Sequence, residues 1–288
     1  MLPAAFIETL RGDLGPERAG VVLSALAAEP EVSVRVNPGK LTLGALRAHF
    51  GELAGEPVAW ASDEGFYLNG RPSFTLDPLF HAGAYYVQEA SSMYAGVLFN
   101  RALDGLGRRT GLRVLDLCAA PGGKTTQLLS HLDDTSVLVT NEVVPSRATV
   151  LADNVARWGR SNVAVTSSDP SAFTALRDRF DVVVTDVPCS GEGMFRKDPR
   201  AVAEWSPDTV KLCAARQRRI VADVWPALAA GGFLIYSTCT FNRSEDEENV
   251  AWICSSLGGS CLEMRHFYPG EDRGEGFFAA LIQKYADR

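Results

Sequence analysis

The second half of the chain alternates between short, continuous apolar runs and longer stretches in which apolar residues recur at helical spacing. The run LRVLDL at 112–117 has the composition of a buried strand, and the stretch at 122–132 has the pattern of a helix. Because continuous apolar strands separated by helices are typical of parallel sheets, the pattern predicts a doubly wound, mostly parallel α/β sheet. The runs that we interpret as its strands are 112–117, 136–142, 162–167, 180–186, 232–238 and 276–284.

Two of the intervening helices carry start signals. Proline at the first turn predicts a helix over Pro145–Trp158. The segment Ser244-Glu245-Asp246-Glu247 has the spacing of a capping box, which predicts a helix that continues through Ser256.

Residues 1–72 lack this alternation. Helical patterns at 4–10 and 17–27 precede a short strand at 32–37 and a helix at 43–50, and a turn-rich stretch closes the segment. Acidic residues outnumber basic ones in this segment, so we do not expect it to bind phosphate groups by itself. We expect a small α/β appendage, joined to the main domain by a connecting strand or turn that leads into a helix.

The composition is that of an ordinary globular chain of 288 residues with a net charge of −7, which argues against a general nucleic-acid binder. No apolar run approaches the roughly 20 residues that span a bilayer, and the N-terminus lacks the features of a secretory signal. We therefore expect a cytoplasmic protein without membrane contact. The cysteines are not in CxxC spacing and the four histidines are scattered, so neither a metal site nor a disulfide framework is expected.

A turn of small residues follows the first strand of the predicted sheet, in LDLCAAPGGKTT. Such a turn lets a ligand approach the backbone N–H groups at a helix N-terminus. A P-loop would need glycine where Cys118 stands, and the G-x-G-x-x-G dinucleotide fingerprint is absent, which leaves S-adenosylmethionine. The residues expected to cradle it are Cys118, Ala119, Ala120, Pro121, Gly122, Gly123 and Lys124.

Two acids follow the next strands at positions suited to that cofactor. Glu142 ends the second strand, where an acid would bind ribose hydroxyls. Asp169 follows the third strand, where a polar residue would meet adenine. Either acid alone is more often a solvated loop carboxylate, but both acids and the loop, in strand order, favour S-adenosylmethionine.

Two cysteines, Cys189 and Cys239, each come just after an apolar strand. Because the carboxyl ends of parallel strands lie at one edge of a sheet, we expect both thiols at the same edge as the cofactor loop. A cofactor loop and two thiols together indicate covalent catalysis by a group-transfer enzyme. Cys213, Cys254 and Cys261 are interpreted as small buried side chains.

The ordered motifs LDLCAAPGGKTTQL, DVVVTDVPCSGEGMFRKDP and YSTCTFNRSEDEENV resemble those of the Nop/Sun family of RNA cytosine-5 methyltransferases. The similarity covers roughly residues 85–284, and it extends weakly to SVRVNPGK near the N-terminus. The paired Pro-Cys and Thr-Cys motifs are highly specific, and Val187 is a mild departure from the usual alanine. The resemblance implies a Rossmann-like S-adenosylmethionine-dependent methyltransferase domain over 73–288, with 1–72 as an appendage that binds RNA or packs.

The resemblance also implies a role for each thiol. Cys239, in the Thr-Cys motif, would be the nucleophile, and Cys189 would help to release the product. The residues alone do not decide which of the two cysteines is the nucleophile, because DNA cytosine methyltransferases use the cysteine of a Pro-Cys motif as nucleophile. Asp186 would face the ring edge of the base and the cofactor, unless it caps the following turn. Lys124 would lie beside Asp186, unless it is a solvated lysine at a helix start, and Arg147 belongs to the cofactor motif.

Chemistry explains why two thiols are useful. Carbon 5 of cytosine is a poor nucleophile, and a thiolate added to carbon 6 turns the ring into an enamine whose carbon 5 can attack a sulfonium methyl group. A base within a duplex cannot reach such a pocket, so the target must be single-stranded or flipped out.

A basic stretch follows the Cys189 motif. Between Met194 and Ile220 there are seven basic and three acidic residues, which fits either a solvated helix face or a surface that contacts an RNA backbone. Within it, Arg196 and Lys197 are the expected RNA contacts, and Phe195 is a possible stacking platform or an inward-packing ring.

The motif HAGAYYVQEASSM resembles the bacterial branch that modifies small-subunit ribosomal RNA, with transfer RNA as the alternative substrate. That branch often carries a C-terminal RNA-binding extension, which we expect to be either missing or cut away in a sequence that stops at Arg288. A catalytically idle RNA-binding or ribosome-assembly factor is a second hypothesis, but it has no chemical need for both thiols. A DNA methyltransferase would require a target-recognition insert between Cys189 and Cys239, and no such insert is recognisable in the sequence. The sequence predicts no oligomeric state.

Overall fold

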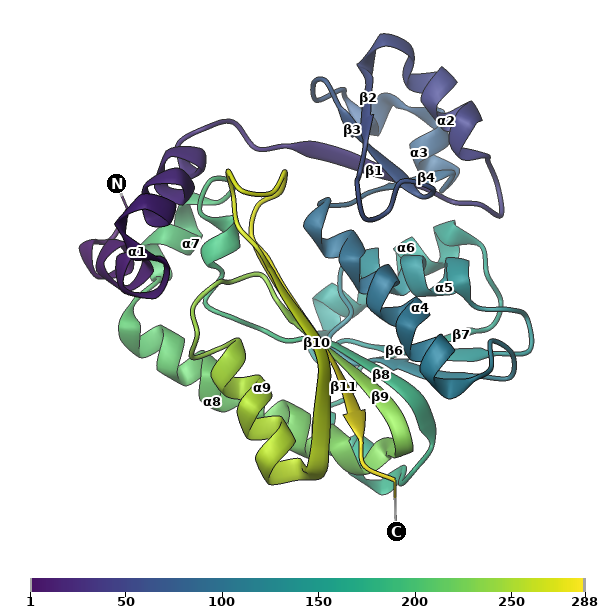
Figure 1. Cartoon of the computed structure of the whole chain (residues 1–288). Coiled ribbons are helices and arrows are strands. Elements are labelled where there is room, and N and C mark those ends of the chain that lie inside the picture. Colours follow the sequence, from purple (N-terminus) through teal and green to yellow (C-terminus); the bar gives the residue numbers. More distant parts are fainter. Residues whose placement is uncertain (1, 287–288) are drawn as a thin grey trace. The chain divides into compact units, whose positions relative to one another are not determined.

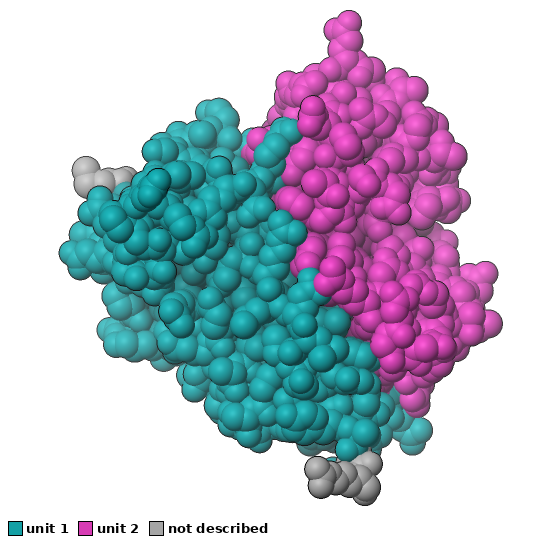
Figure 2. Space-filling view, viewed as in Figure 1, with its two compact units in different colours: residues 1–30, 170–179, 185–288 teal, residues 31–169, 180–184 magenta. Residues whose placement is uncertain are grey.

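The computed structural model describes residues 2–286 (Figure 1). The chain forms two compact units, which Figure 2 shows in different colours. Unit 1 comprises residues 1–30, 170–179 and 185–288, and unit 2 comprises residues 31–169 and 180–184. The strand β8 (Phe180–Asp186) contributes to both.

Unit 2 contains the parallel sheet that the apolar runs predict. Its strands β5 (Arg113–Asp116), β6 (Val137–Asn141) and β7 (Val163–Thr166) lie side by side, and β8 pairs with the other edge of β5. β5 and β8 are buried along most of their length, whereas the edge strand β7 is half-buried to exposed. The helices that follow or precede these strands are α4 (Tyr94–Leu106), α5 (Gly123–His131) and α6 (Pro145–Trp158). The predicted helix at 145–158 is confirmed.

A second, antiparallel sheet lies in the N-terminal part of unit 2, in the order β2-β3-β1-β4. The predicted strand and helix are confirmed as β1 (Val32–Val36) and α2 (Leu43–Phe50). Two further strands of this segment, β2 and β3, were not predicted from the sequence. Each has only four residues, which are too few to show a strand periodicity. These strands and the remaining elements of the segment are β2 (Ala54–Pro57), β3 (Gly65–Leu68), α3 (Pro78–His81) and β4 (Tyr85–Val87).

Unit 1 begins with α1 (Ala4–Leu26), where two separate helices were predicted. Gly15, with φ +78° and ψ 162°, is not helical and divides α1 at a kink into two helical segments, so the prediction of two helices is confirmed. The apolar face of α1 packs Phe6 against Phe195 and Trp205. This packing explains why residues 1–30 join unit 1 and why the compact units do not follow the predicted boundary at residue 72.

The remaining strands of unit 1 are antiparallel. β11 (Phe277–Lys284) lies between β9 (Leu228–Thr238) and β10 (Gly259–Phe267), so the larger sheet has the order β10-β11-β9-β8-β5-β6-β7. The sequence did not predict β10, which has an interrupted pattern of apolar and polar residues and lies at an edge. The helices of this unit are α7 (Pro199–Glu204), α8 (Pro207–Val224) and α9 (Glu247–Trp252), and α9 continues as a π-helical turn, η7 (Ile253–Gly258).

The predicted capping box at Ser244 is wrong. The helix begins at Glu247, and the N-cap residue Asp246 makes no capping bond, because its carboxylate instead accepts a hydrogen bond from the Thr238 hydroxyl. Within residues 2–286, no helix has the length and apolar character that crossing a bilayer requires. Short 3₁₀ turns complete the secondary structure at η1 (Gly51–Leu53), η2 (Phe74–Leu76), η3 (Ser91–Met93), η4 (Pro170–Ala175), η5 (Glu192–Met194) and η6 (Trp225–Ala227).

Candidate active site

The two predicted thiols meet in unit 1. Cys189 lies in the loop after β8, Cys239 directly follows β9, and their sulfur atoms are 3.2 Å apart. Both residues are partly buried. The prediction that these two cysteines converge at one sheet edge is therefore confirmed.

Backbone contacts tie the two cysteine loops together. The Val187 N–H donates to the Ser237 carbonyl at 3.0 Å, and the Gly193 N–H donates to the Cys239 carbonyl at 2.9 Å. A Cβ on Gly193 would lie 2.4 Å from the Gly276 carbonyl oxygen and 2.9 Å from that of Cys239. Only glycine allows this approach, so the glycine after Glu192 in SGEGM is a structural requirement of the thiol site.

Two buried glutamates, which the sequence did not single out, complete the connection. Glu245 accepts the Ser190 N–H at 3.0 Å and the side-chain N–H groups of Gln217 and Asn242 at 2.6 and 2.8 Å. Glu192 accepts the Thr240 hydroxyl at 2.6 Å and the Phe241 N–H at 3.0 Å. Each carboxylate thus bonds groups near both cysteines. The one signal in the sequence is that acids stand within the two cysteine motifs.

A hydrogen bond, burial and nearby charge all act on the Cys189 thiol. The hydrogen bond with Cys239 raises the pKa of Cys189 well above its usual value, and burial and the nearby charges of Glu245 and Asp186 raise it further. The Cys189 thiol is therefore held in its protonated form at neutral pH.

Asp186 ends β8, and its carboxylate accepts a hydrogen bond from the Ser237 hydroxyl at 2.8 Å. It is partly buried in unit 1, on the loop that leads to Cys189. Its predicted contacts with the base and with the cofactor stay predictions.

The predicted cofactor loop lies in unit 2, between β5 and α5. The Ala119 N–H donates to the Asn141 carbonyl at 2.9 Å, and side chains from α6 hold the next two carbonyls. Arg147 donates to the Ala120 carbonyl at 2.9 Å, and Asn154 donates to the Pro121 carbonyl at 2.7 Å. The loop is thus fixed through its own backbone.

Glycines shape the end of this loop. Gly122 has φ +112°, which disfavours any other residue, and Gly123 opens α5. Lys124, in the first turn of α5, is 8% exposed and donates to the Ser92 hydroxyl at 3.0 Å. Lys124 is therefore not the solvated lysine of the alternative interpretation. Its predicted place beside Asp186 stays a prediction.

The two acids expected to bind the cofactor lie at strand ends of unit 2. Glu142 follows β6, is 3% exposed, accepts the Val144 N–H at 3.0 Å and lies 3.6 Å from Arg147. Asp169 is exposed after β7. A narrow loop of small residues and a buried carboxylate one strand away suit the methionine and ribose parts of S-adenosylmethionine. The residues present therefore fit this cofactor.

The structure buries two of the three expected RNA contacts after Cys189, and for Phe195 it matches the inward-packing alternative. The Phe195 ring is 6% exposed and packs on Phe6 with ring centroids 4.9 Å apart, so it offers no stacking platform. The Arg196 side chain, also 6% exposed, donates to Glu275 at 3.0 Å and to the Gly274 and Ala25 carbonyls. Its charge is neutralised inside unit 1. Lys197 lies 3.5 Å from Glu275 and is partly exposed, so its contact with RNA stays a prediction.

Comparisons with known proteins agree on a family. A family model described as 16S rRNA methyltransferase RsmB/F matches residues 105–259, and a model of the N-terminal domain of 16S rRNA methyltransferase RsmF matches residues 2–90. The ribosomal RNA small subunit methyltransferase F of Pectobacterium carotovorum is 37% identical over 99% of this chain and 63% of its own length. The chain therefore spans less than two thirds of the length of that curated relative.

Solved structures share the fold. A methyltransferase homologue from Pyrococcus horikoshii superposes with a TM-score of 0.83 at 29% identity, covering 97% of this chain and 94% of its own. NSun6 from the same organism, solved with SFG, gives 0.86 at 19% identity over 99% of both chains. The fold is that of a Rossmann-like S-adenosylmethionine-dependent methyltransferase, and the predicted Nop/Sun resemblance is confirmed. The chain belongs to the 16S rRNA methyltransferase RsmB/F family.

Proposed function

We propose that this protein transfers a methyl group from S-adenosylmethionine to carbon 5 of a cytosine in small-subunit ribosomal RNA. The observation that carries the proposal is the approach of Cys189 and Cys239 to 3.2 Å at the ends of two strands. Two thiols so placed suit a reaction in which one sulfur adds to the base and the other assists its release. The match of residues 2–90 to an RsmF N-terminal domain favours ribosomal over transfer RNA.

S-adenosylmethionine supplies an electrophilic methyl group on a sulfonium sulfur. The backbone of the loop at 118–123 would hold the amino-acid part, Glu142 the ribose hydroxyls and Asp169 the adenine. Arg147 supports the loop by donating a hydrogen bond to the Ala120 carbonyl. These residues would bind and orient the cofactor, and none of them has to exchange a proton in the reaction.

The thiol pair divides the chemistry on the base. Cys239, whose sulfur lies 3.2 Å from that of Cys189, would add as thiolate to carbon 6 of cytosine, and the electrons displaced would make carbon 5 nucleophilic toward the methyl group. Asp186, which lies just before Cys189 in sequence and accepts a hydrogen bond from Ser237, would face the ring nitrogen and the amino group and stabilise their protonated form.

Release requires a base at carbon 5. Bonding of Cys239 to carbon removes its hydrogen bond with Cys189, which is the largest cause of the raised pKa of Cys189. Cys189 can then release its proton to water and, as a thiolate, accept the proton from carbon 5. The electron pair of that C–H bond restores the 5,6 double bond and expels the Cys239 thiolate.

The test is to incubate the protein with methyl-labelled cofactor and unmodified ribosomal RNA, then to analyse digested nucleosides by mass spectrometry. Wild type should form 5-methylcytidine, and Cys239→Ala should form none above background. Cys254→Ala is the matched control, because it removes a half-buried thiol of the same unit and should leave the product unchanged. No 5-methylcytidine from wild type, while RNA still binds, would instead identify an idle RNA-binding factor.

Transfer RNA offered as a competitor decides the substrate class. Preferential labelling of transfer RNA would overturn the ribosomal assignment and keep the reaction. The proposed location is the cytoplasm, since bacterial ribosomal RNA is found there.

A further inference from the structure

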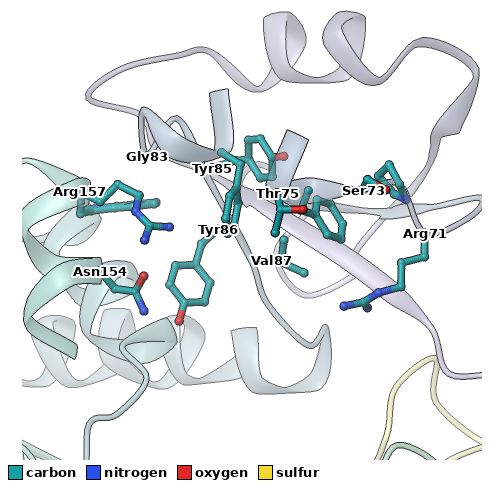
Figure 3. A pocket seen from close by; sticks show the side chains of 13 residues that line it. Arg71, Ser73, Thr75, Gly83, Tyr85, Tyr86, Val87, Asn154 and Arg157 are labelled. Atoms are coloured by element: carbon teal, nitrogen blue, oxygen red, sulfur yellow. The ribbon is translucent and has the colours of Figure 1, made fainter. Parts of the chain in front are cut away.

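A cavity of about 590 Å³ lies in unit 2, on the α6 side of the cofactor loop (Figure 3). This volume is in the range of sites that hold a small molecule or one nucleotide. Its walls come from the loop at 71–75, from Phe80 and Gly83, from β4 and from the last turn of α6. None of the loop residues 118–123 lines it, so it is separate from the predicted cofactor cradle.

The lining is cationic and aromatic. It includes Arg71 and Arg157 and contains no acid, although the chain as a whole has a net charge of −7. The neighbouring acid Asp77 is engaged by the Tyr85 hydroxyl at 2.6 Å and by His49 at 2.8 Å. The charge of the cavity therefore suits an anion.

Aromatic rings hold both guanidinium groups in place. The Arg157 guanidinium carbon lies 5.2 Å from the centre of the Phe80 ring, and that of Arg71 lies 5.6 Å from the centre of the Phe74 ring. In the view of Figure 3, the two arginines reach toward the cavity from opposite sides, with Tyr86 between them. A guanidinium fixed over a ring loses little side-chain entropy when it binds a phosphate.

The cavity wall is anchored on several sides. Asn37 donates to the Trp158 carbonyl at 2.9 Å, and Lys40 donates to the Arg157 carbonyl at 2.6 Å, so the N-terminal sheet holds the end of α6. Gly83, with φ +65°, lies so close to α6 that a Cβ would be 2.1 Å from the Arg157 carbonyl oxygen. The wall is thus built by specific contacts.

Two lining residues of the cavity also contact the cofactor loop or the start of α5. Tyr86, which is partly exposed in the cavity, approaches the start of α5, since a Cβ on Gly123 would lie 3.4 Å from its ring. Asn154, another lining residue, bonds the Pro121 carbonyl of the loop. A ligand here would therefore rest against residues that position the loop.

We propose that this cavity binds one unpaired nucleotide of the substrate RNA, with its base stacked on Tyr86 and its phosphates held by Arg71 and Arg157. The proposal rests on the proposed function, because that function supplies RNA as the substrate. Proteins that bind single-stranded RNA combine such aromatic platforms with basic side chains. This surface replaces the one predicted at Phe195 and Arg196, which the fold buries.

The experiment measures binding of a short, fluorescein-labelled single-stranded RNA to the full chain by anisotropy. Arg157→Gln, Arg71→Gln and Tyr86→Leu should each weaken binding roughly tenfold. Each arginine variant should also lower the dependence of log affinity on log salt by about 0.7. Tyr86→Phe keeps the ring and should bind as wild type does. Arg177→Gln removes the same charge from an exposed position that does not line the cavity, and should also bind normally.

A second readout places the RNA without any variant. Photocrosslinking of wild type to RNA containing 4-thiouridine, followed by peptide mass spectrometry, should yield a peptide that includes Tyr86. Melting temperature and cofactor affinity show whether each variant is folded. Equal RNA affinity for the three cavity variants and Arg177→Gln, with cross-links elsewhere, would overturn the proposal, as would absence of RNA binding by wild type.

The outcomes separate this proposal from the proposed function. RNA bound in the cavity without formation of 5-methylcytidine supports the nucleotide site and refutes the methyltransferase assignment. Formation of 5-methylcytidine at wild-type rates by all cavity variants, with unchanged RNA affinity, supports the assignment and refutes the site.

Discussion

The two candidate sites of this protein are held in place by different means. In unit 2, the cofactor loop is fixed through its backbone, by Asn141 and by side chains of α6 that reach its carbonyls. In unit 1, the two thiol loops are joined by the buried carboxylates Glu192 and Glu245. A buried carboxylate that loses a donor costs more free energy than an exposed bond to a carbonyl. The thiol site should therefore be the more sensitive of the two to single substitutions.

The largest effect is expected from Gly193→Ala. Its Cβ would collide with two backbone carbonyls that cannot move independently, so we expect a loss of about 3 kcal/mol in the free energy of unfolding. Chemical denaturation measures the loss. Gly12→Ala in α1, where a Cβ meets nothing within 4 Å, is the control and should not destabilise. Equal stabilities of the two variants would contradict the packing around Gly193.

Glu245→Gln should separate thiol function from cofactor binding. The new amide would place an N–H group among donors from Ser190, Gln217 and Asn242, so at least one bond is lost at a cost of about 2 kcal/mol. Methyl transfer should fall more than tenfold, while cofactor affinity, measured by calorimetry, stays unchanged. Glu248→Gln, at an exposed position of the same segment, is the control. A parallel loss of cofactor affinity would show that the two sites are not supported independently.

Asp246→Asn should change how stability depends on pH. Burial raises the pKa of this carboxyl well above its usual value, and the charges of Glu245, Glu192 and Glu247 raise it further. Since the folded pKa exceeds the unfolded one, the stability that the protonated form contributes is complete at low pH and is lost as pH rises through the folded pKa. The melting temperature of wild type should therefore fall with rising pH more than that of Asp246→Asn.

The comparison is made by thermal unfolding between about pH 5 and about pH 9. Asp208→Asn, at a side chain that is 87% exposed, should follow the wild-type curve. Parallel curves for wild type and Asp246→Asn would contradict the raised pKa.

The smallest effect is expected at the cofactor loop. Arg147→Gln removes one bond to the Ala120 carbonyl from a side chain that is 54% exposed, so cofactor affinity should fall only a few-fold. Arg160→Gln is the matched control, because Arg160 also donates to a backbone carbonyl of unit 2, that of Leu132. A larger loss for Arg147→Gln than for Glu245→Gln in methyl transfer would reverse the ranking of the two sites.

The difference between the cofactor loop and the thiol site also explains which of their features could be predicted from the sequence. The cofactor loop is recognisable because its conformation depends on its own small residues and on Gly122, and Glu142 follows from its place at a strand end. The meeting of Cys189 and Cys239 follows from the topology of a mostly parallel sheet. These features depend on local patterns and on strand order alone.

Features that depend on distant partners were not predictable. Arg196 is buried because Glu275, 79 residues away in sequence, neutralises it, and Phe195 is buried because α1 packs over it. Glu245 acts on a loop 55 residues away. The cavity beside α6 was missed for the same reason, since Arg71 and Arg157 come together only through the fold.

The most direct test of the covalent mechanism is a denaturing gel of wild type, Cys189→Ala and Cys239→Ala after incubation with labelled RNA and cofactor. We expect a denaturation-stable protein–RNA adduct to accumulate in Cys189→Ala, where addition proceeds and release is blocked, and none to form in Cys239→Ala. An adduct in Cys239→Ala would reverse the roles of the two thiols. Formation of 5-methylcytidine by Cys239→Ala would contradict covalent catalysis through this residue.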